Sequence, residues 1–153
     1  MRKTFRRAAF TCAAAVVGVV AMGSPAVAAA NPYTPASACA EAEGGGNWTD
    51  VDDGHREIMG PGDAVLADVH LMRDSDTGKK CVATLKRADI WNPTFVQASL
   101  QVEGSMPRDQ IHSHRYYAAV ALDARGECVM YGGALVHDGQ AYAVERERWD
   151  NCE

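Results

Sequence analysis

Apolar and polar residues alternate in several short stretches after residue 64, a pattern typical of strands with one buried face. The first stretch places four apolar residues on one face: Val65, Ala67, Val69 and Leu71. Alternation resumes over residues 81–85 after Gly78, which suits a left-handed turn position, so the two stretches predict a β-hairpin. Residues 95–102 alternate again and predict a half-buried strand.

The C-terminal part of the chain continues this pattern with two further predicted hairpins. Residues 115–133 would fold around Ala-Arg-Gly at 124–126, and residues 133–147 around Asp138-Gly139, a dipeptide favoured in two-residue hairpin turns. No helical period extends over more than a few residues. Short strands with turn residues at this spacing predict an all-β fold, a small antiparallel β-sandwich or barrel built from hairpins.

The region before this pattern is rich in Gly, Pro, Ala and Asp. Residues 31–64 include a Gly-Gly-Gly run at 44–46 and a Pro-Gly pair at 61–62, and we expect them to be irregular. Residues 29–38 precede the first cysteine of this region and are expected to form a flexible N-terminal tail. The remainder, residues 39–153, would be a single β domain.

The first 28 residues have the three parts of a secretory signal peptide. A basic start is followed by an apolar run over residues 8–23 and by the small-residue sequence Ala-Val-Ala at 26–28. The run is short for a bilayer span, so we expect cleavage and an extracellular protein that is not membrane-embedded.

Removal of this segment makes the protein more acidic. Residues 1–28 carry four basic residues and no acidic one, while the whole chain already has a formal net charge of −5. A negative protein repels phosphate backbones, so nucleic acid is not an expected partner.

Four cysteines follow the signal peptide: Cys39, Cys81, Cys128 and Cys152. An even number in an exported chain predicts two disulfides, whereas the wide spacing without a Cys-x-x-Cys argues against zinc. Three pairings are open. We favour Cys39–Cys81 with Cys128–Cys152, which attaches each end of the domain to an internal strand. The chain-entropy model gives each bridge about 3.5–4 kcal/mol.

Three short polar segments are candidate metal sites. His112 and His114 would face one way on a strand, with Asp109 nearby, but a polar loop is the simpler interpretation. The acidic segments 50–54 and 74–78 resemble calcium loops without completing the ligand pattern, and the second fits a hairpin turn. We therefore expect neither a metal nor a cofactor.

The sequence also lacks the common catalytic motifs, including G-x-S-x-G and H-E-x-x-H, and we expect no catalytic residues and no enzyme activity. Four aromatic residues are candidates for adhesion to a polymer or surface: Tyr33, Trp48, Trp91 and Trp149. The simpler interpretation is that they cover the core.

Three stretches carry a resemblance to a known family: "DTGKKCVATLK" at 76–86, "YYAAVALDARGECVMYGG" at 116–133 and the closing "RWDNCE". They resemble the spore-associated protein A group of small secreted actinomycete proteins, over most of residues 38–152. The resemblance implies a secreted, non-catalytic protein associated with the spore or hyphal surface, with a structural or adhesive role. It implies no reaction and no catalytic residues.

An alternative function is that of an extracellular protease inhibitor stabilised by disulfides. The tail "CVMYGGALVHDGQAYAVERERWDNC" faintly resembles the corresponding region of secreted actinomycete subtilisin inhibitors. Such an inhibitor needs a rigid exposed loop held by a disulfide, and the segment from Cys128 to Tyr131 would be that loop.

Overall fold

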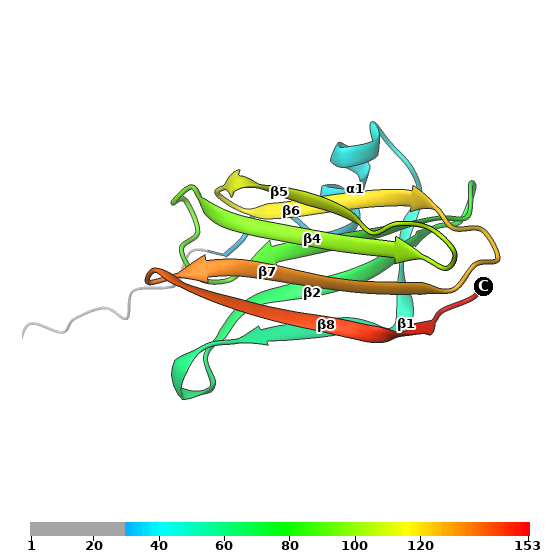
Figure 1. Cartoon of the computed structure of the whole chain (residues 1–153). Coiled ribbons are helices and arrows are strands. Elements are labelled where there is room, and N and C mark those ends of the chain that lie inside the picture. Colours follow the sequence, from blue (N-terminus) through cyan, green and yellow to red (C-terminus); the bar gives the residue numbers. More distant parts are fainter. Residues whose placement is uncertain (1–29) are drawn as a thin grey trace, which may run out of the picture.

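The computed structural model describes residues 30–153 and shows two antiparallel sheets packed face to face (Figure 1). Their strand orders are β1-β2-β3-β6 and β5-β4-β7-β8. The elements are α1 (Pro35–Glu43), β1 (Trp48–Met59), the 3-10 helix η1 (Pro61–Asp63), β2 (Val65–Asp74), β3 (Lys79–Lys86), β4 (Thr94–Val102), β5 (Arg108–His114), β6 (Tyr117–Asp123), β7 (Val129–His137) and β8 (Gln140–Asp150). The predicted all-β sandwich is confirmed. The predicted signal peptide, residues 1–28, lies outside the described residues.

The main core lies between the two sheets. Its fully buried members come from both layers: Val69, Leu71, Val82, Val96, Leu100 and Leu135. A second cluster lies on the outer face of the β1-β2-β3-β6 sheet, where α1 covers Met72, Cys81 and Ala83. Because both faces of this sheet are covered, β2 and β3 are buried almost throughout their length.

Two of the predicted hairpins are confirmed, β2–β3 and β7–β8. In the β7–β8 turn, Asp138 (φ 49°) and Gly139 (φ 76°) both take the left-handed conformation that a type I′ turn needs. The hairpin predicted over residues 115–133 is wrong, because β6 pairs with β3 and β7 pairs with β4 and β8. Residues 124–128 instead cross between the sheets, and buried Ala124 holds this crossing to the core.

Helix α1 and strand β1 correct the expectation of irregular structure over residues 31–64. The helix starts at a capping box, in which Thr34 and Ser37 each accept the other's backbone N–H, and it ends at Gly44 (φ 76°). It buries small residues, Ala38 and Cys39, so a period of large apolar residues does not mark it in the sequence.

The segment expected to be a flexible tail is packed from Asn31 onward. The Asn31 amide donates to the carbonyls of Lys86 (3.0 Å) and Tyr116 (2.8 Å). The Tyr33 ring lies 4.6 Å from the Tyr117 ring, centroid to centroid. These contacts fix the segment beside one end of the sandwich.

The favoured disulfide pairing is confirmed. Cys39–Cys81 joins α1 to β3, and Cys128–Cys152 joins the residue before β7 to the segment after β8. Within residues 30–153, helices are too short or too polar to cross a membrane.

The two sheets approach closely at Gly133 of β7. A Cβ atom added there would lie 2.6 Å from Val69 Cγ2 and would also overlap the hydroxyl of Thr84. Glycine is therefore required by the distance between the sheets. The buried Thr84 hydroxyl has no hydrogen-bond partner in the part of the chain that the structure describes.

Candidate functional site

The connection between β3 and β4, residues 87–93, carries the chain from one sheet to the other at one end of the sandwich. We call it the β3–β4 loop. Within it, Asp89 (φ 52°) and Trp91 (φ 80°) adopt the left-handed backbone conformation. A bulky residue such as Trp rarely takes this conformation, so the surrounding structure must hold the loop in place.

The side chain of Lys86 supplies that support. Lys86 is fully buried, and its Nζ donates to the carbonyls of Asp89 (2.9 Å) and Asn92 (2.9 Å). The same ammonium lies 2.6 Å from Thr94 Oγ1 and 3.3 Å from the carbonyl of His114. One cation thus joins both ends of the β3–β4 loop to the end of β5.

All four acceptors of Lys86 are neutral oxygens. Burial lowers the pKa of the Lys86 ammonium, and the nearby Asp89 charge opposes that effect. A buried cation is tolerated only when its donors are satisfied, and the ring of carbonyls meets that requirement. Sequence reasoning missed this residue, although its position in the alternation of β3 is the one that faces the core.

A second contact joins the β3–β4 loop to β7 of the β5-β4-β7-β8 sheet. Nδ1 of His137, at the end of β7, lies 2.7 Å from Oδ2 of Asp89. This hydrogen bond raises the pKa of His137, because the carboxylate favours the protonated imidazole. The loop is therefore fixed by one buried cation and by one titratable pair.

The supported loop presents Trp91, whose surface is 54% exposed. Its ring meets the ring of Tyr116 edge to face, with centroids 5.1 Å apart. Tyr33 continues the row, 5.6 Å from Tyr116. We call Tyr33, Tyr116 and Trp91 the aromatic patch. Edge-to-face and tilted contacts of this kind are the favourable geometries for aromatic pairs.

The aromatic patch has both apolar and polar groups. Glu41 of α1 raises the pKa of Tyr33 chiefly through a hydrogen bond, so the phenol stays protonated. The patch combines flat apolar rings with neutral hydroxyl groups. Such surfaces suit partners with one apolar and one polar side, including the sugar rings of polysaccharides.

The four aromatic residues singled out from the sequence have different environments. Tyr33 and Trp91 belong to the aromatic patch. Trp48 is only 7% exposed, and its indole N–H donates to the carbonyl of Gly45, so this candidate for adhesion is buried. Trp149 is exposed near the end of β8, where Asp150 pairs with Val129, at the opposite end of β7 from His137.

The His112 and His114 side chains share one face of β5, with ring centroids 5.6 Å apart. They line a hollow that also contains Gln110, whereas Asp109 lines a different hollow on the other sheet face. The Nδ1 atom of His114 accepts the backbone N–H groups of the two following tyrosines. His114 thus orders the β5–β6 connection, and Asp109 does not join the two histidines.

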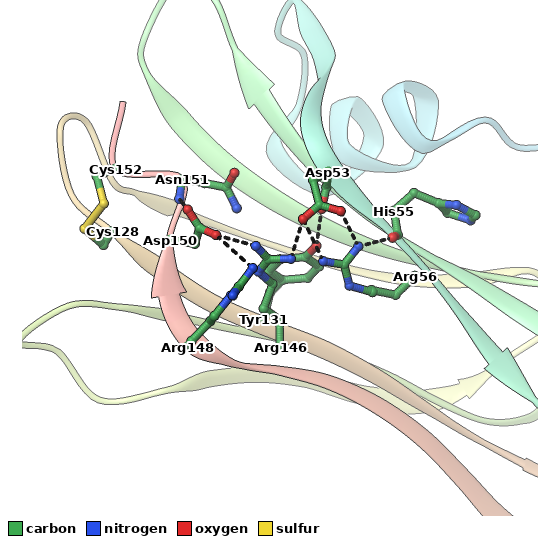
Figure 2. Close-up of polar contacts among 10 residues, drawn as sticks. All are labelled: Asp53, His55, Arg56, Cys128, Tyr131, Arg146, Arg148, Asp150, Asn151 and Cys152. Atoms are coloured by element: carbon green, nitrogen blue, oxygen red, sulfur yellow. Dashed lines mark hydrogen bonds and ion pairs between the residues drawn. A yellow bond between two sulfur atoms is a disulfide. The ribbon is translucent and has the colours of Figure 1, made fainter.

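The acidic segment 50–54 faces cations of the protein itself. Asp53 lies between Arg146 of β8 (2.7 Å) and Arg56 of β1 (3.0 Å), as Figure 2 shows. Its carbonyl accepts the Tyr131 hydroxyl at 3.2 Å. This network joins the two sheets along the edge formed by β1 and β8 (Figure 1).

The second acidic segment is a hairpin turn. Asp74 accepts the backbone N–H groups of Asn47 (3.1 Å) and Asp76 (3.2 Å) and the hydroxyl of Thr77 (2.6 Å). The hydrogen bond from Thr77 makes the largest contribution to lowering the pKa of Asp74. The Asp74 carboxylate therefore accepts the hydrogen bonds that stabilise the β2–β3 turn, as the turn interpretation predicts.

The segment from Cys128 to Tyr131 is not an exposed loop, contrary to the inhibitor interpretation. Val129 and Tyr131 are 0% and 3% exposed. They lie in β7, which is hydrogen-bonded to β4 on one side and β8 on the other. The bridge Cys128–Cys152 closes the end of this strand pair (Figure 2).

Comparisons of the chain with protein-family models, with curated proteins and with solved structures return no match.

Proposed function

We propose that this protein is a secreted, non-catalytic adhesive domain that associates with a spore or cell surface through the aromatic patch. The observation that carries the proposal is the exposed Trp91, held in an unfavourable backbone conformation by the buried ammonium of Lys86. Backbone strain that the surrounding structure maintains is typical of binding sites.

Two further features support the proposal. The two disulfides suit a small domain that works outside the cell, where thiols are oxidised. The aromatic patch also offers rigid rings with few rotatable bonds, so binding costs little side-chain entropy. The ligand class that fits is an insoluble polymer of sugars, because sugar rings carry both apolar C–H faces and hydroxyl groups.

An inhibitory function is not proposed. A protease inhibitor presents an exposed strand-like loop to the enzyme, whereas the segment assigned to that role is the centre of a sheet with its inward side chains buried.

The location and the adhesion can be tested together in a sporulating actinomycete culture that expresses the chain. Quantitative mass spectrometry would compare the medium, the vegetative mycelium and a mild detergent wash of intact spores. The proposal predicts enrichment in the spore wash or in the mycelium, and it predicts that a Trp91→Ala variant shifts into the medium. Wild-type protein found only in the medium would contradict it.

A further inference from the structure

Three side chains with metal-binding atoms meet on the outer face of the β1-β2-β3-β6 sheet: His55 of β1, and Asp68 and His70 of β2. His55 and His70 are directly opposite each other in the strand register, with ring centroids 4.7 Å apart. His55 Nε2 lies 2.8 Å from Asp68 Oδ1. One ligand atom from each residue falls within 4.8 Å of the other two.

A large bulge in β1 builds this cluster. Asp50 pairs with Met72 and His55 pairs with His70, so residues 51–54 of β1 stand opposite the single residue Leu71 of β2. Gly54 permits the insertion, since a Cβ there would lie 2.7 Å from the carbonyl oxygen of Val51.

The bulge separates two groups of side chains. It sends Asp53 toward Arg146, while His55 points away from that network (Figure 2). Asp50, before the insertion, comes close to the other end of the cluster, with Oδ1 3.5 Å from His70 Nδ1.

Two imidazoles with one carboxylate form a common donor set for zinc, which takes His nitrogen at about 2.0–2.1 Å and carboxylate oxygen at about 2.0–2.2 Å. Ligand atoms around a tetrahedral zinc are about 3.4 Å apart, so the atoms of the cluster, within 4.8 Å of one another, would have to approach by at most about 1.4 Å.

Arg87 competes for the same carboxylate. Its guanidinium donates to both oxygens of Asp68, with Nη2 2.8 Å from Oδ1. The Arg87 side chain is about half exposed and can swing into solvent, whereas Asp68 is held in the sheet. The Arg87 guanidinium therefore neutralises the carboxylate that a bound metal ion would otherwise neutralise.

We propose that His55, Asp68 and His70 bind one zinc-class divalent metal ion, with Asp50 or water as the remaining ligand. The site connects β1 to β2. Asp68 and His70 also line a groove of about 410 Å³ that extends to Tyr33 and Ile90, so the bound ion is accessible to small molecules. None of the three proposed ligands belongs to the aromatic patch, so zinc binding and adhesion can be tested with separate variants.

Isothermal titration calorimetry with zinc chloride tests the proposal, on protein purified without a histidine tag. Wild type is expected to bind one zinc ion per chain. The double variant His55→Gln/His70→Gln should bind at least 100-fold more weakly. The matched control is His112→Gln/His114→Gln, which removes the other histidine pair of the sandwich and should leave the affinity unchanged.

Arg87→Gln provides a readout that a purely structural ion pair would not give. Removing the competing guanidinium should tighten zinc binding several-fold, although it breaks an ion pair with Asp68. If circular dichroism shows that the double variant is unfolded, the single variant His55→Gln replaces it in the titration. This variant is expected to fold, because the His55 side chain is 46% exposed. Absence of saturable zinc binding, or equal affinities in wild type and the His55 variant, would overturn the proposal.

Discussion

Lys80 and Lys86 lie on the same face of β3 and donate hydrogen bonds to loops at opposite ends of the sandwich. Lys86 holds the β3–β4 loop, while Lys80 Nζ donates to the carbonyls of Glu127 (2.7 Å) and Asn151 beside the second disulfide. Both side chains are at most 1% exposed. Burial lowers the pKa of each ammonium, and each is compensated by backbone carbonyl oxygens.

This arrangement predicts that the two lysines have separable effects. Lys86→Met keeps an apolar stem of similar length but leaves the carbonyls of Asp89 and Asn92 without their donor. We expect it to lower the free energy of unfolding by about 2–3 kcal/mol. It should also weaken surface binding through the aromatic patch. Urea denaturation and a cosedimentation assay with washed spores measure the two effects.

Lys80→Met is the matched control for that experiment. It should destabilise the fold to a similar extent, because it also strips backbone carbonyls of a buried donor. Surface binding of the folded protein should remain unchanged, since Lys80 acts at the other end of the sandwich. Equal loss of binding in both variants would show that adhesion follows general stability and not the β3–β4 loop.

The close approach of the sheets at Gly133 predicts a strong effect of a single methyl group. Gly133→Ala would place a Cβ within 2.6 Å of Val69 Cγ2, so the sheets must separate locally. We expect a loss of about 2–3 kcal/mol, the upper range for overpacking. Gly139→Ala meets free space and costs only the left-handed backbone strain, about 1–2 kcal/mol, so it should destabilise less, and a reversed order in thermal denaturation would contradict the packing argument.

The unpaired hydroxyl of Thr84 predicts a stabilising substitution. Thr84→Val keeps the shape of the side chain and removes a buried polar group without a partner among the described residues. We expect the free energy of unfolding to rise by about 0.5–1 kcal/mol. Chemical denaturation monitored by tryptophan fluorescence would measure it. A clear loss of stability would mean that the hydroxyl is satisfied in solution.

The His137–Asp89 pair predicts a pH dependence of stability. Asp89 raises the pKa of His137 in the folded protein, so the pair stabilises the fold fully below the unfolded pKa of about 6.5. The contribution is lost as the pH rises through the folded pKa. Because the pair is partly exposed, we expect it to add about 0.5 kcal/mol more to the free energy of unfolding at a pH of about 5.5 than at about 8.5. His137→Gln should lack this component, and parallel stability profiles would contradict the assignment.

The sequence was sufficient for the elements whose signal is local. Alternation identified β2, β3 and β4, and Asp138-Gly139 identified the β7–β8 turn. These features depend on side-chain period and turn geometry, which neighbouring residues largely determine. The cysteine pairing favoured from position along the chain, one of three open pairings, is also confirmed.

The errors arose where long-range packing decides the structure. β6 and β7 look like a hairpin, but a crossing through buried Ala124 places them in different sheets. Helix α1 is stabilised by its caps and by the bridge from Cys39, and not by an apolar stripe.

The candidate sites were the least accessible to sequence reasoning. Lys86 acquires its role from four oxygens contributed by three segments, and His55 meets His70 only through the β1 bulge. The alternation Asp68-Val69-His70 was the one local signal, because it places a carboxylate and an imidazole on one face of a strand.

The most direct test of the account compares the binding of purified wild type, Trp91→Ala and Trp149→Ala to washed spores and hyphae. Both substitutions remove an exposed tryptophan, but only Trp91 belongs to the aromatic patch. Saturable binding that weakens at least tenfold in Trp91→Ala and is unchanged in Trp149→Ala is the predicted result. Equal binding by all three proteins would contradict adhesion through the aromatic patch.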